Sequence, residues 1–254
     1  MSDASPRPRP TWLVDEPFTD VELGVLKQGK EAQVDLVERT GVDGRSCLIA
    51  RKRYLPRQVK EKGALEALGV QRASTFRHDV QYREGRQFRK SRDRRAVELG
   101  TTYGKRLMQD RWTGHEHEVM GTLWAAGLPV PYPIDYAEDV FDLEYLGDLD
   151  AAAPQLHAAR LDADDLASAF DQLVDGLRIM VRAGWVHADL SAYNLLWWRG
   201  ELWFIDFPQA IDLAANPQGL NLLHHDVENI CAWFARRRHP CDAEAVFADL
   251  LVEL

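Results

Sequence analysis

Apolar and polar residues alternate along the first half of the chain in the way that half-buried strands require. Residues 21–37 have the pattern of a strand, a glycine turn and a second strand, and residues 46–54 have that of a third strand. A helix is expected over 113–126, and a short strand over 140–145 follows a proline-rich connector. This half of the chain is therefore predicted to be rich in strands.

The second half changes to helical spacing from about residue 163. Apolar side chains then recur every three or four positions: Leu166, Phe170, Leu173, Leu177 and Val181. Gly184 follows as the expected C-cap of this helix. The aromatic-rich segment 194–207 predicts a β-hairpin that turns at Arg199 and Gly200, and Asp226 is the expected N-cap of a last amphipathic helix.

These elements predict an α+β protein with two lobes, whose boundary lies near residues 145–148. Residues 1–20 begin with a proline-rich stretch and are expected to form a disordered tail. The strand-rich N-lobe is expected over 21–145, with a long insertion at about 55–111, and the helical C-lobe over 146–254. A length of 254 residues suits such a domain.

Charge is distributed very unevenly along the chain. The formal net charge of −9 argues against a general nucleic-acid binder, yet residues 51–111 hold 18 Lys and Arg against 7 Asp and Glu, a local charge of +11. One interpretation is that this segment contacts RNA or the ribosome through phosphate groups. The other is a solvated loop that offsets an acidic body, and the sequence leaves both open.

Targeting signals and cysteine patterns are lacking in the sequence. Its first residues have no apolar stretch typical of a signal peptide, and no run approaches 18 apolar residues, so a cytoplasmic protein without a membrane partner is expected. The three cysteines predict no disulfide framework. Cys231, His239 and Cys241 do not have the spacing of a structural zinc site, and the histidines at 115, 117, 224 and 225 are expected to be solvated or capping residues.

The strongest chemical signal is a loop that runs from His187 to Asn194 and is followed by Asp206. The predicted hairpin would return Asp206 to the neighbourhood of Asn194, so that two oxygen ligands converge on one site for a hard metal ion such as Mg²⁺. Asp189 is placed to orient a hydroxyl group and accept its proton. The spacing His-x-Asp-Leu-x-x-x-Asn is typical of a phosphoryl-transfer loop.

A second signal places a lysine inside the N-lobe. Lys52 alternates with Arg51 and Arg53 on the third strand, so it faces inward if the arginines face solvent. A buried ammonium group needs an anion or a carboxylate partner. Glu116 is the expected partner because it shares a helix face with apolar side chains, whereas Glu118 lies on another face.

Several motifs, in order, resemble those of the RIO family of atypical serine kinases. They are GKEA (29–32), A-x-K-x-Y (50–54), Trp112 before Glu116, AGLPVPYP (126–133), LEYLG (143–147), VHADLSAYN (186–194), IDFPQA (205–210) and HHDVENI (224–230). The resemblance covers residues from about 26 to 234. It is closer to the subgroup without an N-terminal winged helix. Phe207-Pro208 departs from the residues common after this aspartate in the family.

The resemblance implies a compact protein-kinase-like fold that uses ATP and Mg²⁺, with Mn²⁺ as an alternative ion. It makes Asp189, Lys52 and Asp206 the catalytic residues, with Asn194 and Asp206 as metal ligands. Asp206 is also a candidate for a transient aspartyl-phosphate. The residues implied in nucleotide binding are Gly29, Lys30, Glu31, Ala32, Lys52, Glu116, Glu144 and Leu146, the last two through a hinge whose backbone would bond adenine.

The expected activity is phosphorylation of protein serine or threonine, including autophosphorylation. Residues Ser74, Thr75, Ser91, Thr101 and Thr102 are the candidate autophosphorylation sites. One alternative is an ATPase switch that acts in ribosome assembly or on RNA, which the basic segment motivates. Another is a small-molecule kinase of the aminoglycoside or choline type, although no acidic C-terminal insert for a cationic substrate is apparent.

Overall fold

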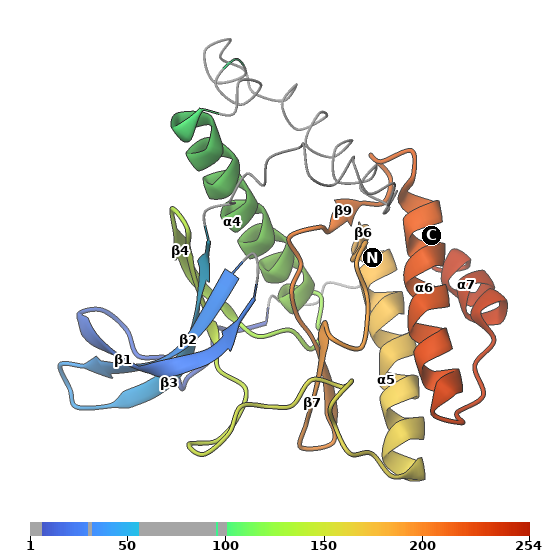
Figure 1. Cartoon of the computed structure of the whole chain (residues 1–254), viewed down its shortest axis with the longest axis horizontal. Coiled ribbons are helices and arrows are strands. Elements are labelled where there is room, and N and C mark those ends of the chain that lie inside the picture. Colours follow the sequence, from blue (N-terminus) through green and yellow to red (C-terminus); the bar gives the residue numbers. More distant parts are fainter. Residues whose placement is uncertain (1–6, 30–31, 56–94, 96–100) are drawn as a thin grey trace, which may run out of the picture.

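The computed structural model describes residues 7–29, 32–55, 95 and 101–254, with the side chains of 102–112 not included in the description (Figure 1). An antiparallel sheet in the order β1-β2-β3-β5-β4 forms the N-lobe. Its elements are β1 (Phe18–Gln28), β2 (Ala32–Gly41), β3 (Ser46–Tyr54), β4 (Pro133–Ala137) and β5 (Val140–Glu144), together with helix α4 (Thr102–Ala125). Helix α4 lies across the sheet on the side that faces the C-lobe (Figure 1).

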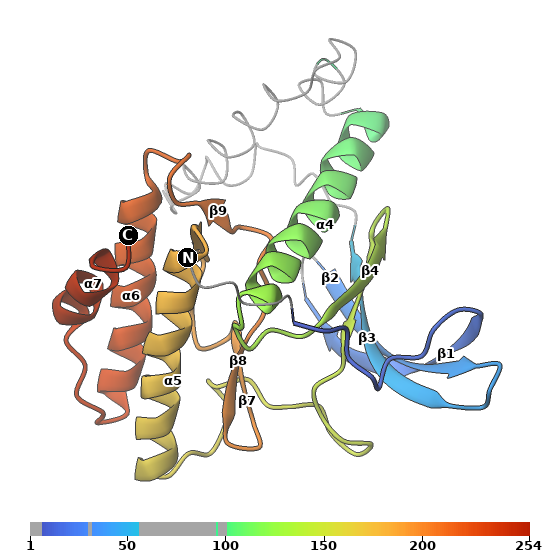
Figure 2. The same ribbon diagram turned by 180° about the vertical axis from the view of Figure 1, so that it is seen from behind.

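The C-lobe consists of helices beside two small two-stranded sheets. Its helices are α5 (Ala163–Arg182), α6 (Gly219–Arg236) and α7 (Ala243–Leu251). Its strands are β6 (Trp185–Val186), which pairs with β9 (Ile211–Asp212), and β7 (Leu195–Trp198), which pairs with β8 (Glu201–Phe204). The three helices lie side by side at the far side of the molecule from the sheet, and the β7–β8 hairpin stands between them and the N-lobe (Figures 1 and 2). The predicted two-lobed α+β fold is confirmed.

Most of the predicted elements are present, but two boundaries differ. Helix α4 begins at Thr102, so residues 102–111 of the predicted insertion are helical. Strand β1 begins at Phe18, and Leu13 and Val14 before it are only 4% and 2% exposed, so the predicted tail over 1–20 is too long. Neither segment has the regular apolar spacing on which the predictions relied.

The role predicted for Asp226 was wrong. Helix α6 begins seven residues earlier, at Gly219, so Asp226 lies within it, and this side chain is buried. An aspartate before an apolar stretch has the pattern of an N-cap, yet here it sits among the apolar residues of the helix. Its carboxylate serves a neighbouring loop, as described below.

The prediction that the cysteines form no disulfide was also wrong. Cys231 on α6 is bonded to Cys241, which lies just before α7, and Cys47 is free. The link joins residues whose proximity depends on the turn between two helices, which a spacing rule does not capture.

Among the described residues, no helix is long and apolar enough to cross a membrane.

The two faces of the N-lobe sheet carry different charges. Arg51 and Arg39 point to the face opposite Lys52, where both bind the carboxylates of Asp20 and Asp142 at 2.6–2.9 Å. The inward direction of Lys52 was predicted on the condition that Arg51 faces solvent. Arg51 instead lies in a largely buried ion-pair network. The alternation itself holds, and it directs Lys52 to the inner face.

Candidate active site

Lys52 lies between two carboxylates that come from different parts of the chain. Its Nζ is 2.8 and 2.9 Å from the two oxygens of Glu116 and 2.7 Å from Oδ1 of Asp206. Burial of the ammonium group favours a lower pKa, but the charges of Asp206 and Glu116 outweigh it and hold the pKa of Lys52 well above its ordinary value. Lys52 is therefore a permanent cation at this position.

Glu116 is the junction of this cluster. Its side chain is fully buried on α4, and it accepts hydrogen bonds from Lys52, from the hydroxyl group of Tyr54 and, at 3.0 Å, from the backbone N–H of Phe207. The exposed Glu118 has no part in it, so the predicted choice of Glu116 as the partner is confirmed. Burial and then the charge of Glu116 raise the pKa of Tyr54, so its hydroxyl group stays protonated and donates.

The β7–β8 hairpin returns the chain as predicted. The N–H of Ile205 donates to the carbonyl of Asn194 at 3.0 Å, which places Asp206 beside the end of the loop. The positive charge of Lys52 outweighs burial and lowers the pKa of Asp206, so this side chain is a carboxylate. Asp206 has a φ of 71°, a left-handed conformation that costs a non-glycine residue about 1 kcal/mol or more.

Asn194 is held by the loop that it ends. Its Nδ2 donates to the backbone carbonyl of Asp189 at 2.7 Å, and the side chain is largely buried. This bond fixes the orientation of the amide, and it leaves the Oδ1 atom as the group that can act as a ligand. An amide oxygen and a carboxylate on adjoining backbone suit a hard divalent cation such as Mg²⁺.

Asp226 anchors the loop that carries Asp189. Its carboxylate accepts from the N–H groups of Ala188 at 2.7 Å and Leu190 at 2.9 Å, the residues on either side of Asp189, and Asn229 donates to the carbonyl of Leu190. Asp189 itself is exposed. Burial raises the pKa of Asp226, while the two N–H groups and His187 oppose that shift. This role of Asp226 was not predicted from its sequence pattern, although an acid on the apolar face of a helix is a usable signal.

His187 connects this loop to the segment that carries Asp206. Its ring is buried, with Nε2 3.1 Å from the carbonyl oxygen of Ile205 and the ring centroid 4.7 Å from that of Phe207. Within the described residues, its Nδ1 has no hydrogen-bond partner. His187 therefore packs Phe207 into the core and supports the backbone next to Asp206.

The structure describes only some of the residues that were predicted to contact the nucleotide. The Gly29 N–H donates to the carbonyl of Ala32 at 2.8 Å, which closes the expected turn, while Lys30 and Glu31 lie outside the described residues. At the hinge, the N–H of Glu144 already donates to Tyr132, so an adenine contact at Glu144 would use its carbonyl group. The carbonyl of Leu146 accepts from Ala153, which leaves its N–H as the group to face adenine.

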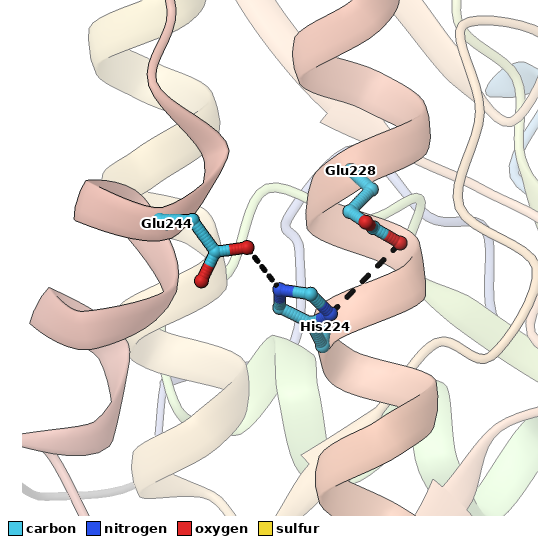
Figure 3. A group of neighbouring side chains, drawn as sticks. All are labelled: His224, Glu228 and Glu244. Atoms are coloured by element: carbon cyan, nitrogen blue, oxygen red, sulfur yellow. Dashed lines mark hydrogen bonds and ion pairs between the residues drawn. The ribbon is translucent and has the colours of Figure 1, made fainter.

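A cluster of possible metal ligands lies elsewhere, between α6 and α7. Nε2 of His224 is 2.8 Å from Glu244, and its Nδ1 is 3.9 Å from Glu228 (Figure 3). The two carboxylates face different nitrogens of one ring, so they do not share a ligand point with it. The arrangement ties α6 to the start of α7. His115 contacts the carbonyl of Ala210, and His117 packs against Tyr136, so these two side chains have different neighbours.

The fold and this geometry define a kinase-like phosphotransferase: an inward lysine paired with a helix glutamate, a loop aspartate, and an asparagine–aspartate pair on a hairpin. The chain belongs to the RIO family, because residues 67–246 match the model of the RIO domain. The expected family is thereby confirmed.

Sequence relatives of the chain are RIO-type serine/threonine-protein kinases. Rio1 of Haloferax volcanii is 30% identical over 235 residues, which make up 92% of this chain and 70% of the relative. Rio1 of Thermoplasma acidophilum is 32% identical over 135 residues, 53% of this chain and 69% of the relative. Human RIO3 is 29% identical over 126 residues, which cover 49% of this chain but 24% of that protein.

Solved structures agree on the fold. The Rio2 kinase of Chaetomium thermophilum, in a complex with ADP, Mg²⁺ and phosphoaspartate, superposes with a TM-score of 0.58 at 16% identity. A second structure of the same kinase gives 0.57 at 18%. These alignments cover 89% and 92% of this chain but 61% and 63% of the Rio2 chains, so the chain spans about three fifths of their length.

Proposed function

We propose that this protein transfers the γ-phosphoryl group of ATP to a serine or threonine hydroxyl group of a protein, itself included. The observation that carries the proposal is the position of Lys52, which lies within hydrogen-bonding distance of Glu116 and Asp206 at once. Glu116 holds the ammonium group in place, and the phosphate oxygens of ATP would be its third anionic partner. An inward lysine of this kind stabilises the charge of the transferring group.

Asp206 and Asn194 would hold the divalent cation, Mg²⁺ or alternatively Mn²⁺. When bound, the ion neutralises negative charge on the phosphates. Asp206 contributes a carboxylate that Lys52 keeps ionised, and Asn194 contributes an amide oxygen whose orientation its bond to Asp189 fixes. Both residues lie on backbone joined by the Ile205–Asn194 hydrogen bond, so the ligand pair is organised before the ion arrives.

Asp189 would accept the proton of the attacking hydroxyl group. The acceptor oxygen forms a bond to the γ-phosphorus, the bond from that phosphorus to the bridging oxygen of ADP breaks, and the proton passes to the Asp189 carboxylate. Asp226 supports this step because it holds the N–H groups on both sides of Asp189. Position, rather than covalent chemistry, supplies the acceleration.

Asp206 is also our candidate for a transient aspartyl-phosphate. A phosphoaspartate is named in the Rio2 kinase complex from Chaetomium thermophilum, and Asp206 is an aspartate that lies beside Lys52. Acyl phosphates are cleaved by hydroxylamine, whereas phosphoserine is stable to it. Label that is released by hydroxylamine from the wild type and is missing from Asp206→Asn would support this step.

The direct test of the proposed activity is incorporation of labelled phosphate from ATP by the Asp189→Asn variant. We expect a loss of about 10²-fold or more, because the replacement keeps the shape but cannot accept the proton. Loss of a positioned catalytic group should leave ATP binding intact, which equilibrium binding would check. Full labelling by Asp189→Asn would refute the assignment.

The basic segment 51–111 supports a second proposal, that the protein contacts RNA or the ribosome and uses ATP turnover as a switch. The local charge of +11 on a chain of net charge −9 is its motivation. Replacing residues 56–94 with a neutral linker would leave α4 intact. RNA association that is unchanged at low salt in that variant would remove the basis of this proposal. A cytoplasmic location is part of both proposals.

A further inference from the structure

An exposed patch lies directly beside the loop that carries Asp189. Tyr193 is 54% exposed, and its ring packs edge-on against the exposed His157, with 4.2 Å between the centroids. Nη2 of Arg237 donates to the carbonyl of His157 at 3.0 Å. These three residues, here called the Tyr193 patch, come from the catalytic loop, the segment before α5 and the end of α6.

The Tyr193 patch is attached to the catalytic loop by backbone hydrogen bonds. The N–H of His157 donates to Ala192 at 3.0 Å, and that of the preceding residue donates to Leu195 at 2.8 Å. Tyr193 is four residues after Asp189, and Asn194 next to it is bonded to the Asp189 carbonyl. The Tyr193 patch therefore adjoins the loop to which an acceptor hydroxyl group would be brought.

Positive charge dominates the patch. The guanidinium group of Arg237 lies 3.7 Å from the centre of the Trp233 ring, and the exposed Arg236 and Arg238 flank it in the sequence. Within the part of the chain that the structure describes, none of these three arginines forms an ion pair with a carboxylate. On a protein of net charge −9, the guanidinium group of Arg237 gives the Tyr193 patch a positive charge.

Arg237 is also held ready for a ligand. The ring of Trp233 supports one face of the guanidinium group, and the bond to His157 uses one of its five N–H groups. A side chain whose rotamer is already fixed loses less conformational entropy when it binds a carboxylate. The guanidinium group can also donate to both oxygens of that carboxylate. Stacking beside Tyr193 suits the flat backbone and apolar atoms of an extended peptide.

We propose that the Tyr193 patch is the acceptor-binding surface and that it selects acidic residues near the serine or threonine to be phosphorylated. This inference rests on the proposed kinase activity, since it names the substrate class of the same site. We favour a peptide over RNA for two reasons. The serine or threonine hydroxyl group that reaches Asp189 must belong to the bound polypeptide. The patch also offers one fixed guanidinium group, whereas RNA binding usually requires a row of cations along the phosphate backbone.

The test compares short serine peptides that differ only in whether glutamate or lysine flanks the acceptor. For each enzyme we would measure kcat/KM with both peptides and take their ratio. The wild type should favour the glutamate peptide by up to about fivefold, the factor that one exposed charge pair can supply. Arg237→Glu should reverse the ratio, and Arg237→Gln, which keeps a donor for the His157 carbonyl, should abolish the preference.

Arg45→Glu is the matched control, because Arg45 is an exposed arginine in the turn between β2 and β3 of the N-lobe. It should keep the wild-type ratio. Equal kcat/KM for both peptides in the wild type would overturn the inference, as would an Arg237→Gln enzyme with an unchanged ratio. Tighter binding of RNA than of either peptide, lost in Arg237→Glu, would also overturn it. Autophosphorylation that persists in those cases leaves the proposed function standing, whereas its absence in the wild type refutes both.

Discussion

At the scale of single residues, the charge on Lys52 decides the state of its neighbours. Its ammonium group is the largest cause of the lowered pKa of Asp206, and with Glu116 it forms a buried pair. Removal of one partner from such a pair leaves an uncompensated charge. Activity and local stability are therefore linked at this one side chain.

Replacement of Lys52 by methionine should reduce phosphoryl transfer by about 10²–10³-fold, because one preorganised cation is lost from the charged transition state. Turnover of labelled ATP at fixed enzyme concentration would measure this. Arg53→Met is the control, since Arg53 is the next residue on β3 but pairs with Glu22 and Asp35 on the other face. Comparable losses in both variants would mean that the effect comes from the strand and not from the site.

Acid should weaken the fold partly through Asp206. The folded state lowers the pKa of this carboxyl below its ordinary 3.8. Between the folded pKa and this ordinary value, the unfolded chain therefore binds more protons than the folded protein. Its stabilising contribution is present above pH 3.8 and is lost as the pH falls through the folded pKa. Denaturant midpoints measured between about pH 2 and 5 should therefore fall less steeply on acidification in Asp206→Asn than in the wild type. Parallel curves would contradict the assignment.

At the scale of elements, the approach of α5 to the hairpin depends on a glycine. A Cβ atom at Gly176 would lie 2.5 Å from Cζ of Phe204 and 3.1 Å from Leu128, inside the core. Glycine costs a helix about 1 kcal/mol relative to alanine, so its presence here reflects packing. The helix and strand β8 can approach closely only because no side chain intervenes.

Gly176→Ala should therefore destabilise the protein, by about 1–3 kcal/mol in free energy of unfolding, because Phe204 has to move within a packed core. Denaturant unfolding would measure the difference. Gly121→Ala is the matched control on α4, since the nearest atom to its Cβ would be Pro133 Cγ at 3.9 Å. That variant should gain stability by about 0.5–1 kcal/mol from helix propensity. A stabilised Gly176→Ala would show that the packing is loose.

The elements that were predicted well are those whose pattern is local. The apolar spacing of α5 and the Arg199-Gly200 turn are complete within one segment, so both were found. The inward direction of Lys52 and the choice of Glu116 followed from strand alternation and helix faces. In contrast, residues 102–111 have no such pattern, so the start of α4 at Thr102 was not predicted.

The parts of the site that were missed depend on contacts between distant segments. Asp226 bonds the N–H groups of Ala188 and Leu190 from 36 residues away or more, and Phe207 donates to Glu116 across 91. The bond between Tyr54 and Glu116 has the same character. Backbone donors carry no residue type, so no motif could have predicted which side chain would satisfy them.

At the scale of the whole molecule, the segment before β1 covers the outer side of the N-lobe. Leu13 and Val14 are almost fully buried, and a Cβ atom on Gly41 of β2 would collide with Val14. Figure 2 shows this segment passing from the α4 side of the molecule to the edge strand β1. It therefore joins parts of the N-lobe that the sheet alone does not connect.

Leu13→Ala should lower the free energy of unfolding by about 2 kcal/mol or more, because a buried leucine is truncated. Thermal or denaturant unfolding would measure it. Trp12→Ala is the control, since Trp12 is 36% exposed and should cost less despite its greater size. A larger loss for Trp12→Ala would mean that Leu13 contributes little and that the segment is held by its indole ring.

The meeting of several partners on one buried carboxylate has a pharmacological consequence. A compound that binds beneath α4 and displaces Glu116 would have to break its hydrogen bonds to the Lys52 ammonium group, the Tyr54 hydroxyl group and the Phe207 N–H. Because all three groups bind the same carboxylate, a displacement of Glu116 would weaken the three contacts together, and such a ligand would stabilise a conformer without the Lys52–Glu116 pair. Inhibitors of this enzyme could then be sought among ligands that bind beneath α4, as well as among mimics of adenine.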